Sequence, residues 1–224
     1  MISINLLTEI ITIFYYVYYD MAKQTNKELE IAAKQVLKNK FLAVTDIDKE
    51  ALQAFVNLLT IETFKNNTLI IREHQTIENI YFIYKGVIRI FFNKNDKIII
   101  ERFEKEGGFF GGNYDHFSKY PSVHNFQSLE DMVVLKIKHA DLDNLCKKYH
   151  SIEHLYRMLL VAFHYSYVDK LYALKASTSE ERYRDFEKEY GDIINRISLR
   201  NVASYLGMTS ETISRIRARQ HEKR

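Results

Sequence analysis

The stretch from Leu199 to Gln220 reads LRNVASYLGMTSETISRIRARQ, with residue types spaced as in two short helices joined by a tight turn. Val202 and Leu206 would face the second helix, Ala203 would permit close contact, and Gly207 would make the turn. The other matching positions are Met208, Thr209 as an N-cap, Ile213 and Ile216. This spacing predicts a helix-turn-helix, with an ordinary helical hairpin as the alternative.

The outward positions of the second helix could read DNA, because recognition helices contact bases through their N-terminal residues. Arg215 can donate two hydrogen bonds to guanine, and Glu211 can accept one from cytosine. DNA repels a carboxylate that meets no base donor, so Glu211 favours specific readout, and it can also pair with Arg215 four residues later. The predicted base-reading residues are Ser210, Glu211, Ser214 and Arg215, and the predicted phosphate contacts are Arg200, Thr209, Thr212, Arg217 and Arg219.

The C-terminal segment is also the basic part of the chain. Residues 191–224 contain seven Lys/Arg and three Asp/Glu, while the whole chain has a formal net charge of +3, so the segment is +4 and the remainder −1. A basic end on a near-neutral body suggests a polyanionic partner at that end. A solvated helix face is the alternative explanation.

Residues 24–60 have helical periodicity, with Asp46 or Asp48 as a plausible N-cap of a second helix. From Ile61 to Ile137 short runs rich in Ile, Phe, Tyr and Val alternate with turn residues, a pattern typical of an all-β sandwich, barrel or roll. The predicted strands are Leu69–Ile71, Ile80–Tyr84, Val87–Phe92, Ile98–Phe103, Val123–Gln127 and Met132–Ile137.

From about His139 the helical period returns, and the sequence predicts a long helix over Ser151 to Ala176. Its narrow apolar seam favours pairing with a second copy of the helix, while packing only on its own β domain is the alternative. The predicted dimerisation residues are Ile152, Leu155, Leu159, Ala162, Ser166 and Ala173. Thr178 and Glu181 then form a capping box that begins a short helix ending near Gly191.

These features resemble the CRP/FNR family of bacterial regulators over about residues 25–220. SETISRIR is similar to the family's recognition helix, and YFIYKGVIRIF is similar to its sensor strands around Lys85-Gly86. The Asn/Lys/Tyr-rich composition is most similar to the Bacteroidetes-type members.

The resemblance implies an α+β fold: a double-stranded, jelly-roll-like β-roll as sensor, a long dimerisation helix and a C-terminal winged helix-turn-helix. It divides the chain into an uncertain N-terminal extension (1–20), a cyclic-nucleotide-binding-like roll with flanking helices (21–138), a linker and dimerisation helix (139–177) and the DNA-binding domain (178–224). The last wing hairpin is expected to be missing or minimal, because little sequence follows the recognition helix.

The expected effector site departs from that of nucleotide-binding members of the family. Their phosphate-binding cassette follows a Phe-X-Gly-Glu turn and ends in Arg-Ser or Arg-Thr, whereas this chain has Gly112 in place of the Glu and Ser122-Val123 near the pair. The resemblance therefore implies that cyclic AMP is not the effector. The candidate pocket for an unknown small-molecule effector comprises Phe110, Gly111, Gly112, Asn113, Ser122 and Val123.

Several other classes of protein lack support in the sequence. The single cysteine, Cys146, excludes an iron–sulfur cluster and is expected to be a buried structural thiol, with a redox sensor as the alternative. No catalytic or metal-binding spacing is present, so His116, His124 and His139 are expected to be surface or core residues. The apolar run at residues 6–19 contains Glu9 and is shorter than the ~20 residues of a membrane-spanning helix.

The sequence therefore predicts a cytoplasmic, non-enzymatic regulator without cofactor or metal. Its expected partners are double-stranded DNA, a second copy of itself, RNA polymerase and a small-molecule effector, with no membrane. A homodimer would bind a palindromic operator whose half-sites lie ~34 Å apart. The alternative is a sensor module whose main role is to bind a small molecule, cyclic nucleotides included.

Overall fold

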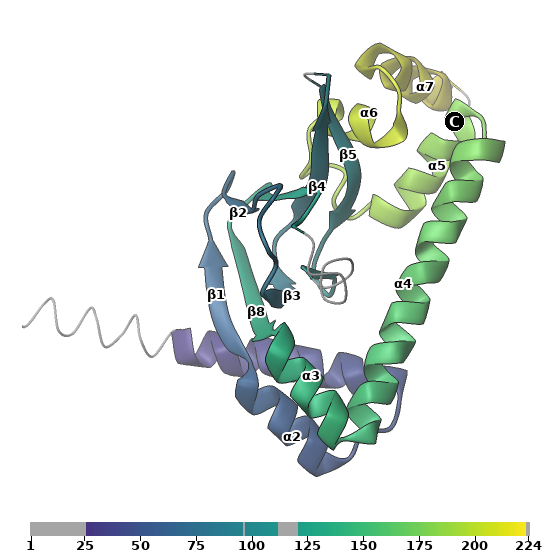
Figure 1. Cartoon of the computed structure of the whole chain (residues 1–224). Helices are drawn as coiled ribbons and strands as arrows, with labels where there is room; N and C mark the ends of the chain where they lie inside the picture. Colours follow the sequence, from purple (N-terminus) through teal and green to yellow (C-terminus); the bar gives the residue numbers. More distant parts are fainter. Residues whose placement is uncertain (1–25, 96, 112–120, 223–224) are drawn as a thin grey trace, which may run out of the picture.

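The computed structural model of the chain describes residues 26–95, 97–111 and 121–222. In the sequence, helices precede and follow the strands of two sheets. One long helix, α4, connects the two ends of the molecule (Figure 1). Gly112, Asn113, His116 and the predicted extension at residues 1–20 lie outside the described residues.

The described residues form an α+β fold. The helices are residues 26–44, α2 (Lys49–Leu58), α3 (His139–Lys148), α4 (His150–Ala176), α5 (Ser179–Tyr190), α6 (Leu199–Leu206) and α7 (Ser210–Glu222). The strands are β1 (Thr60–Phe64), β2 (Leu69–Ile71), β3 (Asn79–Lys85), β4 (Ile88–Lys94), β5 (Lys97–Glu104), β6 (Phe109–Phe110), β7 (Asn125–Ser128) and β8 (Met132–Lys138). They make two four-stranded antiparallel sheets, β1-β8-β3-β6 and β2-β7-β4-β5, which confirms the predicted fold class.

Central strands of the roll are buried on both faces. On β3, Tyr81 and Ile83 point into the roll, whereas Phe82 packs against helices outside it. On β8, Val134 likewise points into the roll and Leu135 packs against the helices outside it. Because successive side chains point to opposite faces, a strand buried on both sides must be apolar at consecutive positions. This is the physical reason for the unbroken apolar runs in the sequence.

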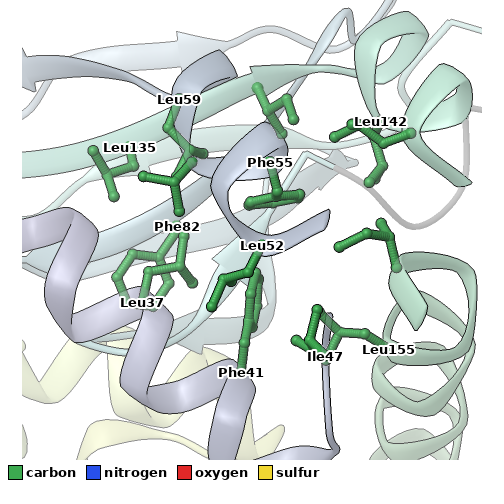
Figure 2. Close-up of a cluster of buried hydrophobic side chains, with 14 of the residues drawn as sticks. Leu37, Phe41, Ile47, Leu52, Phe55, Leu59, Phe82, Leu135, Leu142 and Leu155 are labelled. Atoms are coloured by element: carbon green, nitrogen blue, oxygen red, sulfur yellow. The ribbon is translucent and has the colours of Figure 1, made fainter. Parts of the chain in front are cut away.

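A layer of helices covers the outer face of sheet β1-β8-β3-β6. Figure 2 shows Leu37 and Phe41 of the first helix and Phe55 of α2 beside Leu135 of the sheet. The rings of Phe41 and Phe55 meet edge to face, with centroids 5.2 Å apart. Leu155 of α4, 2% exposed, belongs to the same cluster. Burying each such side chain contributes roughly 1.5–3 kcal/mol, so this cluster holds the start of α4 on the roll.

The outer face of sheet β2-β7-β4-β5 packs instead against the C-terminal helices. Phe103 of β5, 1% exposed, has its ring centroid 6.3, 5.8 and 5.5 Å from those of Phe186, Tyr190 and Tyr205. Phe91 of β4 belongs to the same cluster. The roll and the C-terminal helices therefore share one hydrophobic core, although α4 separates them in the sequence.

All six predicted strands are present, with ends shifted by at most two residues. The strands β1 and β6 escape prediction. β1 reads TIETF, with polar residues at three of its positions, and β6 is only two residues long. Neither has the run of apolar or β-branched residues that marks a strand locally.

The predicted helices are also confirmed. α4 begins one residue before the predicted start, and α5 ends at Tyr190. The capping box is present: the Thr178 hydroxyl accepts from the Glu181 N–H, and the Glu181 carboxylate accepts from the Thr178 N–H at 2.7 Å. Asp48 precedes α2, but its carboxylate accepts a hydrogen bond from the Ser151 hydroxyl rather than capping the helix.

Beyond β8, the described residues up to 222 form helices and turns and no wing strand. No helix in the described ranges combines the length and the apolar character that crossing a bilayer requires.

The shared core predicts that truncating Phe103 weakens the whole fold. Phe103→Ala removes a fully buried ring, and such changes cost about 3–5 kcal/mol. Chemical denaturation should show that loss of unfolding free energy, while Ile98→Ala on the same strand, 39% exposed, changes it little. Equal small effects of the two variants would contradict a common core.

Candidate nucleic-acid interface

The C-terminal motif folds as the sequence predicts. Gly207 ends α6 in the left-handed region, with φ of +65°, and its successor's N–H donates to the Ala203 carbonyl at 2.9 Å. A glycine adopts this conformation without the steric cost that a Cβ would bring. Val202, Leu206 and Ile213 are 0%, 4% and 0% exposed, so the two helices pack through the predicted positions.

The start of α7 is organised by Thr209. Its hydroxyl accepts from the Thr212 N–H at 3.2 Å, which satisfies a backbone donor that the helix itself leaves free. Hydrogen bonds from its own N–H and from the Thr209 side chain lower the pKa of Glu211, and the charge of Arg215 adds to this effect. These contacts favour the charged form of the Glu211 carboxyl and hold it at the helix N-terminus.

The predicted base-reading residues share one surface of α7. Glu211, Ser214 and Arg215 are exposed and Ser210 is partly buried. No hydrogen bond or ion pair joins Arg215 to another described side chain, and the same is true of Arg200 at the start of α6. These guanidinium groups remain available to a ligand.

Two of the predicted phosphate contacts are held by α5 instead. The Arg217 Nε donates to the Tyr183 hydroxyl at 2.7 Å, and its guanidinium lies 5.6 Å from the centre of that ring. Arg219 pairs with Glu180 at 3.0 Å. In this structure both arginines tie the recognition helix to α5. Their role in phosphate binding stays a prediction.

Polar bonds that the sequence did not suggest attach α6 to the roll. The Ser204 hydroxyl donates to the Ile98 carbonyl at 2.8 Å and accepts from the Ile100 N–H at 3.1 Å. Arg89 of β4 donates to the Asn201 side chain at 2.9 Å. Each bond fixes α6 against the β4–β5 hairpin. Serine is common in helices, so the sequence alone could not indicate that Ser204 contacts β5.

An ion-pair cluster fixes the turn that leads into α6. Arg196 binds Glu106, with Nη2 2.6 Å from Oε1, and also binds Glu130. Although burial raises the pKa of Glu106, hydrogen bonds from Arg196 and from the Gly86 N–H outweigh it and hold the pKa at about 2. Lys105 adds a contact to Asp192 at 2.5 Å. The roll thus positions α6 and the turn before it by charge as well as by packing.

A buried polar network joins β5 to the middle of α4. Arg102 donates to the Tyr167 hydroxyl at 2.6 Å, Tyr167 binds Glu101, and Glu101 pairs with His124 at 2.9 Å. Burial raises the pKa of Glu104 to about 7 despite the Arg102 guanidinium 3.1 Å away. Charged residues inside the strand sequence KIIIERFE were the signal that this face of β5 is polar.

The predicted dimerisation residues divide between two environments. Ile152 and Leu155 are 1% and 2% exposed in the chain's own core, so neither is available to a partner, and Leu159 packs against the same cluster. Ala162, Ser166 and Ala173 line a cleft of about 800 Å³ between α4, β5 and α5.

A second, exposed apolar stripe of α4 consists of residues that each precede a predicted seam residue by one position. Met158, Val161, Tyr165 and Tyr172 are 38%, 42%, 65% and 67% exposed. One residue is about 100° of rotation on a helix with 3.6 residues per turn. The large exposed apolar side chains are therefore rotated by about 100° from the predicted seam, although Ala162 and Ser166 of that seam are also exposed.

The candidate effector pocket is only partly described. Phe110 is buried inside the roll and stacks on Tyr81 with centroids 4.6 Å apart. Gly111 has φ of +84°, and a Cβ there would lie 2.5 Å from the Asn79 carbonyl, so the backbone excludes any larger residue. Ser122 is buried and its hydroxyl donates to the His124 carbonyl, whereas Val123 is 61% exposed.

The remaining candidate residues behave as structural groups. His139 is buried, with Nε2 2.8 Å from the Gly111 carbonyl, and His124 pairs with Glu101. Cys146 is half-buried beside the helical core, and burial together with Asp143 and Glu153 raises the pKa of its thiol to about 11. No group of metal-ligating side chains occurs among the described residues.

The ion-pair cluster at Glu106 predicts a specific loss of stability in acid. A carboxyl whose pKa falls from 4.5 to about 2 on folding stabilises the fold above pH 4.5, and this contribution disappears as pH drops toward 2. Glu106→Gln should have a lower melting temperature at pH 6 and a shallower decline between pH 5 and 2.5. Glu50→Gln, whose exposed carboxylate lies on α2, serves as the control. Parallel acid profiles for wild type and Glu106→Gln would refute the role of this cluster.

Comparison with known proteins supports this architecture. Residues 61–149 match the sequence profile of the cyclic nucleotide-binding domain family. No curated protein sequence matches the chain.

The similarity to solved structures extends beyond that domain. FixK2 from Bradyrhizobium japonicum superposes with a TM-score of 0.64 at 22% identity, covering 74% of this chain and 85% of that one. The c-di-GMP responsive global regulator CLP of Xanthomonas campestris gives 0.60 at 13% identity, covering 79% and 93%. A cyclic nucleotide-binding domain from Methylobacillus flagellatus gives 0.52 at 10%, covering 60% and 82%. Residues 61–149 thus match the cyclic nucleotide-binding domain family, and the chain shares the overall fold of FixK2 and CLP.

Proposed function

We propose that this protein is a homodimeric, sequence-specific DNA-binding transcription regulator that acts in the cytoplasm. The observation that carries the proposal is the exposed surface of α7, where Glu211, Ser214 and Arg215 share one face of a well-capped recognition helix. The fold shared with CLP, itself a global regulator that controls gene expression, supports the same conclusion.

The electrostatics of α7 favour selective binding. No direct ion pair holds Arg215 or Arg200 among the described residues, although the charge of Arg215 acts on Glu211, so guanine and phosphate oxygens can bind these guanidinium groups without breaking one. Glu211 would be repelled by phosphates, and only a base-edge donor such as the cytosine amine compensates it. A surface that presents both an arginine and a carboxylate to the bases therefore contributes more to sequence specificity than to sequence-independent affinity.

Dimerisation supplies the second half of the operator contact. Met158, Val161, Tyr165, Val168 and Tyr172 follow one another by alternating steps of three and four residues along α4. That spacing is typical of the seam of a two-stranded coiled coil. Met158, Val161, Tyr165 and Tyr172 are exposed and open to a second copy, and Val168 is half-buried. We therefore assign the dimer seam to this stripe, with RNA polymerase as a further partner.

A second candidate function is that of a sensor whose main role is to bind a small molecule. The match of residues 61–149 to the cyclic nucleotide-binding domain favours it. Val123 brings no polar group to the position near the family's arginine, so we still expect cyclic AMP to bind poorly.

Base reading by Arg215 can be tested on a DNA site selected from a random pool. Arg215→Ala should weaken binding to that site by about 1–3 kcal/mol and relax preference at one base pair, because a bidentate contact to guanine is lost. Fluorescence anisotropy at fixed salt gives both quantities. Arg184→Ala, at an exposed position on α5, is the matched control. Unchanged affinity and preference in Arg215→Ala would refute the assignment.

The dimer seam can be tested by placing a charge in it. Tyr165→Glu should shift the protein from dimer to monomer in sedimentation equilibrium, because two carboxylates would face each other across an apolar seam. Leu174→Glu is the control: Leu174 is 53% exposed and lies on the opposite side of the same helix. A Tyr165→Glu variant that remains dimeric would place the interface elsewhere.

A further inference from the structure

A cavity of about 270 Å³ lies outside the β-roll, between sheet β1-β8-β3-β6 and the helices that cover it. Leu37 and Phe41 of the first helix, Leu135 of β8, and Leu159 and Phe163 of α4 are among its lining residues. It thus occupies the opposite face of the sheet from the roll interior, where Tyr81 and Phe110 stack. Phe110 lines this cavity and is also a member of the candidate effector pocket.

The size of the cavity sets the size of its occupant. A dry apolar cavity of about 150 Å³ holds benzene, so one of 270 Å³ has room for roughly ten non-hydrogen atoms. A wall this apolar offers water few hydrogen bonds, which favours an apolar guest over ordered solvent.

Lys40 places a positive charge at the edge of the cavity. Its Nζ lies near the Gly107-Gly108 turn, 3.8 Å from where a Cβ on Gly107 would stand. Lys40 is exposed and has no hydrogen bond or ion pair with any other described residue. An anionic group at this turn would therefore gain a partner without displacing one.

Glu104, the nearby acid in the lining, does not oppose such an anion strongly. Its carboxylate is paired with the Arg102 guanidinium at 3.1 Å, which offsets its charge, and burial raises its pKa. Lys40 is the only lysine or arginine among the described residues that line the cavity.

We propose that this cavity binds a small amphipathic carboxylic acid of about ten non-hydrogen atoms, with its apolar chain among the core side chains and its carboxylate at Lys40. Tyr156, Leu159, Leu160 and Phe163 of α4 line the cavity, so an occupant contacts the helix that carries the dimer seam. The binding site itself is independent of the proposed DNA-binding function; its use in regulation rests on that function.

Octanoate and 1-octanol are matched probes, because they share the chain length and differ in the charge of the head group. Isothermal titration calorimetry and thermal denaturation of the full chain should show saturable octanoate binding and a raised melting temperature. Lys40→Met should weaken octanoate binding about tenfold, the effect of losing one charge-assisted hydrogen bond, and leave octanol unchanged. Lys27→Met, at an exposed position on the same helix, should behave as wild type.

Filling the cavity tests its location. Leu160→Trp should abolish binding of both probes, and Leu160→Phe, a smaller change, should weaken both if the tryptophan variant does not fold. Ile31→Trp, at a position 61% exposed on the first helix, is the control. The proposal is overturned if wild type binds neither probe, if cavity-filling variants bind octanoate normally, or if Lys40→Met affects both probes equally.

A third measurement separates this inference from the proposed function. Fluorescence anisotropy on the selected operator, with and without octanoate, reports DNA binding directly. Octanoate binding without any DNA binding would leave the cavity assignment standing and refute the regulator. If the protein binds DNA but does not bind octanoate, the proposed function stands and the cavity assignment is refuted.

Discussion

Burial of both faces of sheet β2-β7-β4-β5 is the constraint on which the arrangement of this protein depends. One face closes the roll, and the other, through Phe103 and its neighbours, forms the core of the C-terminal helices. If either layer moved, apolar surface would be exposed to water, which costs roughly 25 cal/mol of free energy per Å². The position of the recognition helix is therefore a property of the β-roll as much as of its own sequence.

Packing alone does not fix orientation, because apolar contacts have little directionality. Orientation comes from polar groups at the rim of the shared core. Arg196 joins Glu106 and Glu130, Ser204 bonds two backbone groups of β5, and Arg89 reaches the Asn201 amide. The same division recurs along β5, where Glu101 and Arg102 hold α4 through Tyr167. β5 carries both apolar and charged side chains, so one element holds both helical parts.

The long helix α4 is the structural link between these regions. Figure 1 shows α4 running from the N-terminal helices to the C-terminal ones. Its start is buried with the N-terminal helices, its middle bonds to β5, and its exposed stripe is available to a second copy. A change at the cavity beside Leu159 and Phe163 would thus act directly on α4, the helix to which we assign the dimer seam. This is the geometry that a regulator needs, because an effector acts only if it binds two arrangements with different affinity.

The sequence by itself determined the local features. The helix-turn-helix, the Thr178 capping box and the central strands depend on contacts between near neighbours, so residue type and spacing suffice to predict them. The tertiary structure alone decided the rest. α4 carries two apolar stripes about 100° apart, and only the burial of Ile152 and Leu155 in the core shows which one the chain uses for itself. The sequence predicts Arg217 and Arg219 as phosphate contacts, and the structure shows that they also bind Tyr183 and Glu180 of α5. Partners far apart in the sequence decide these roles, and no local pattern encodes them.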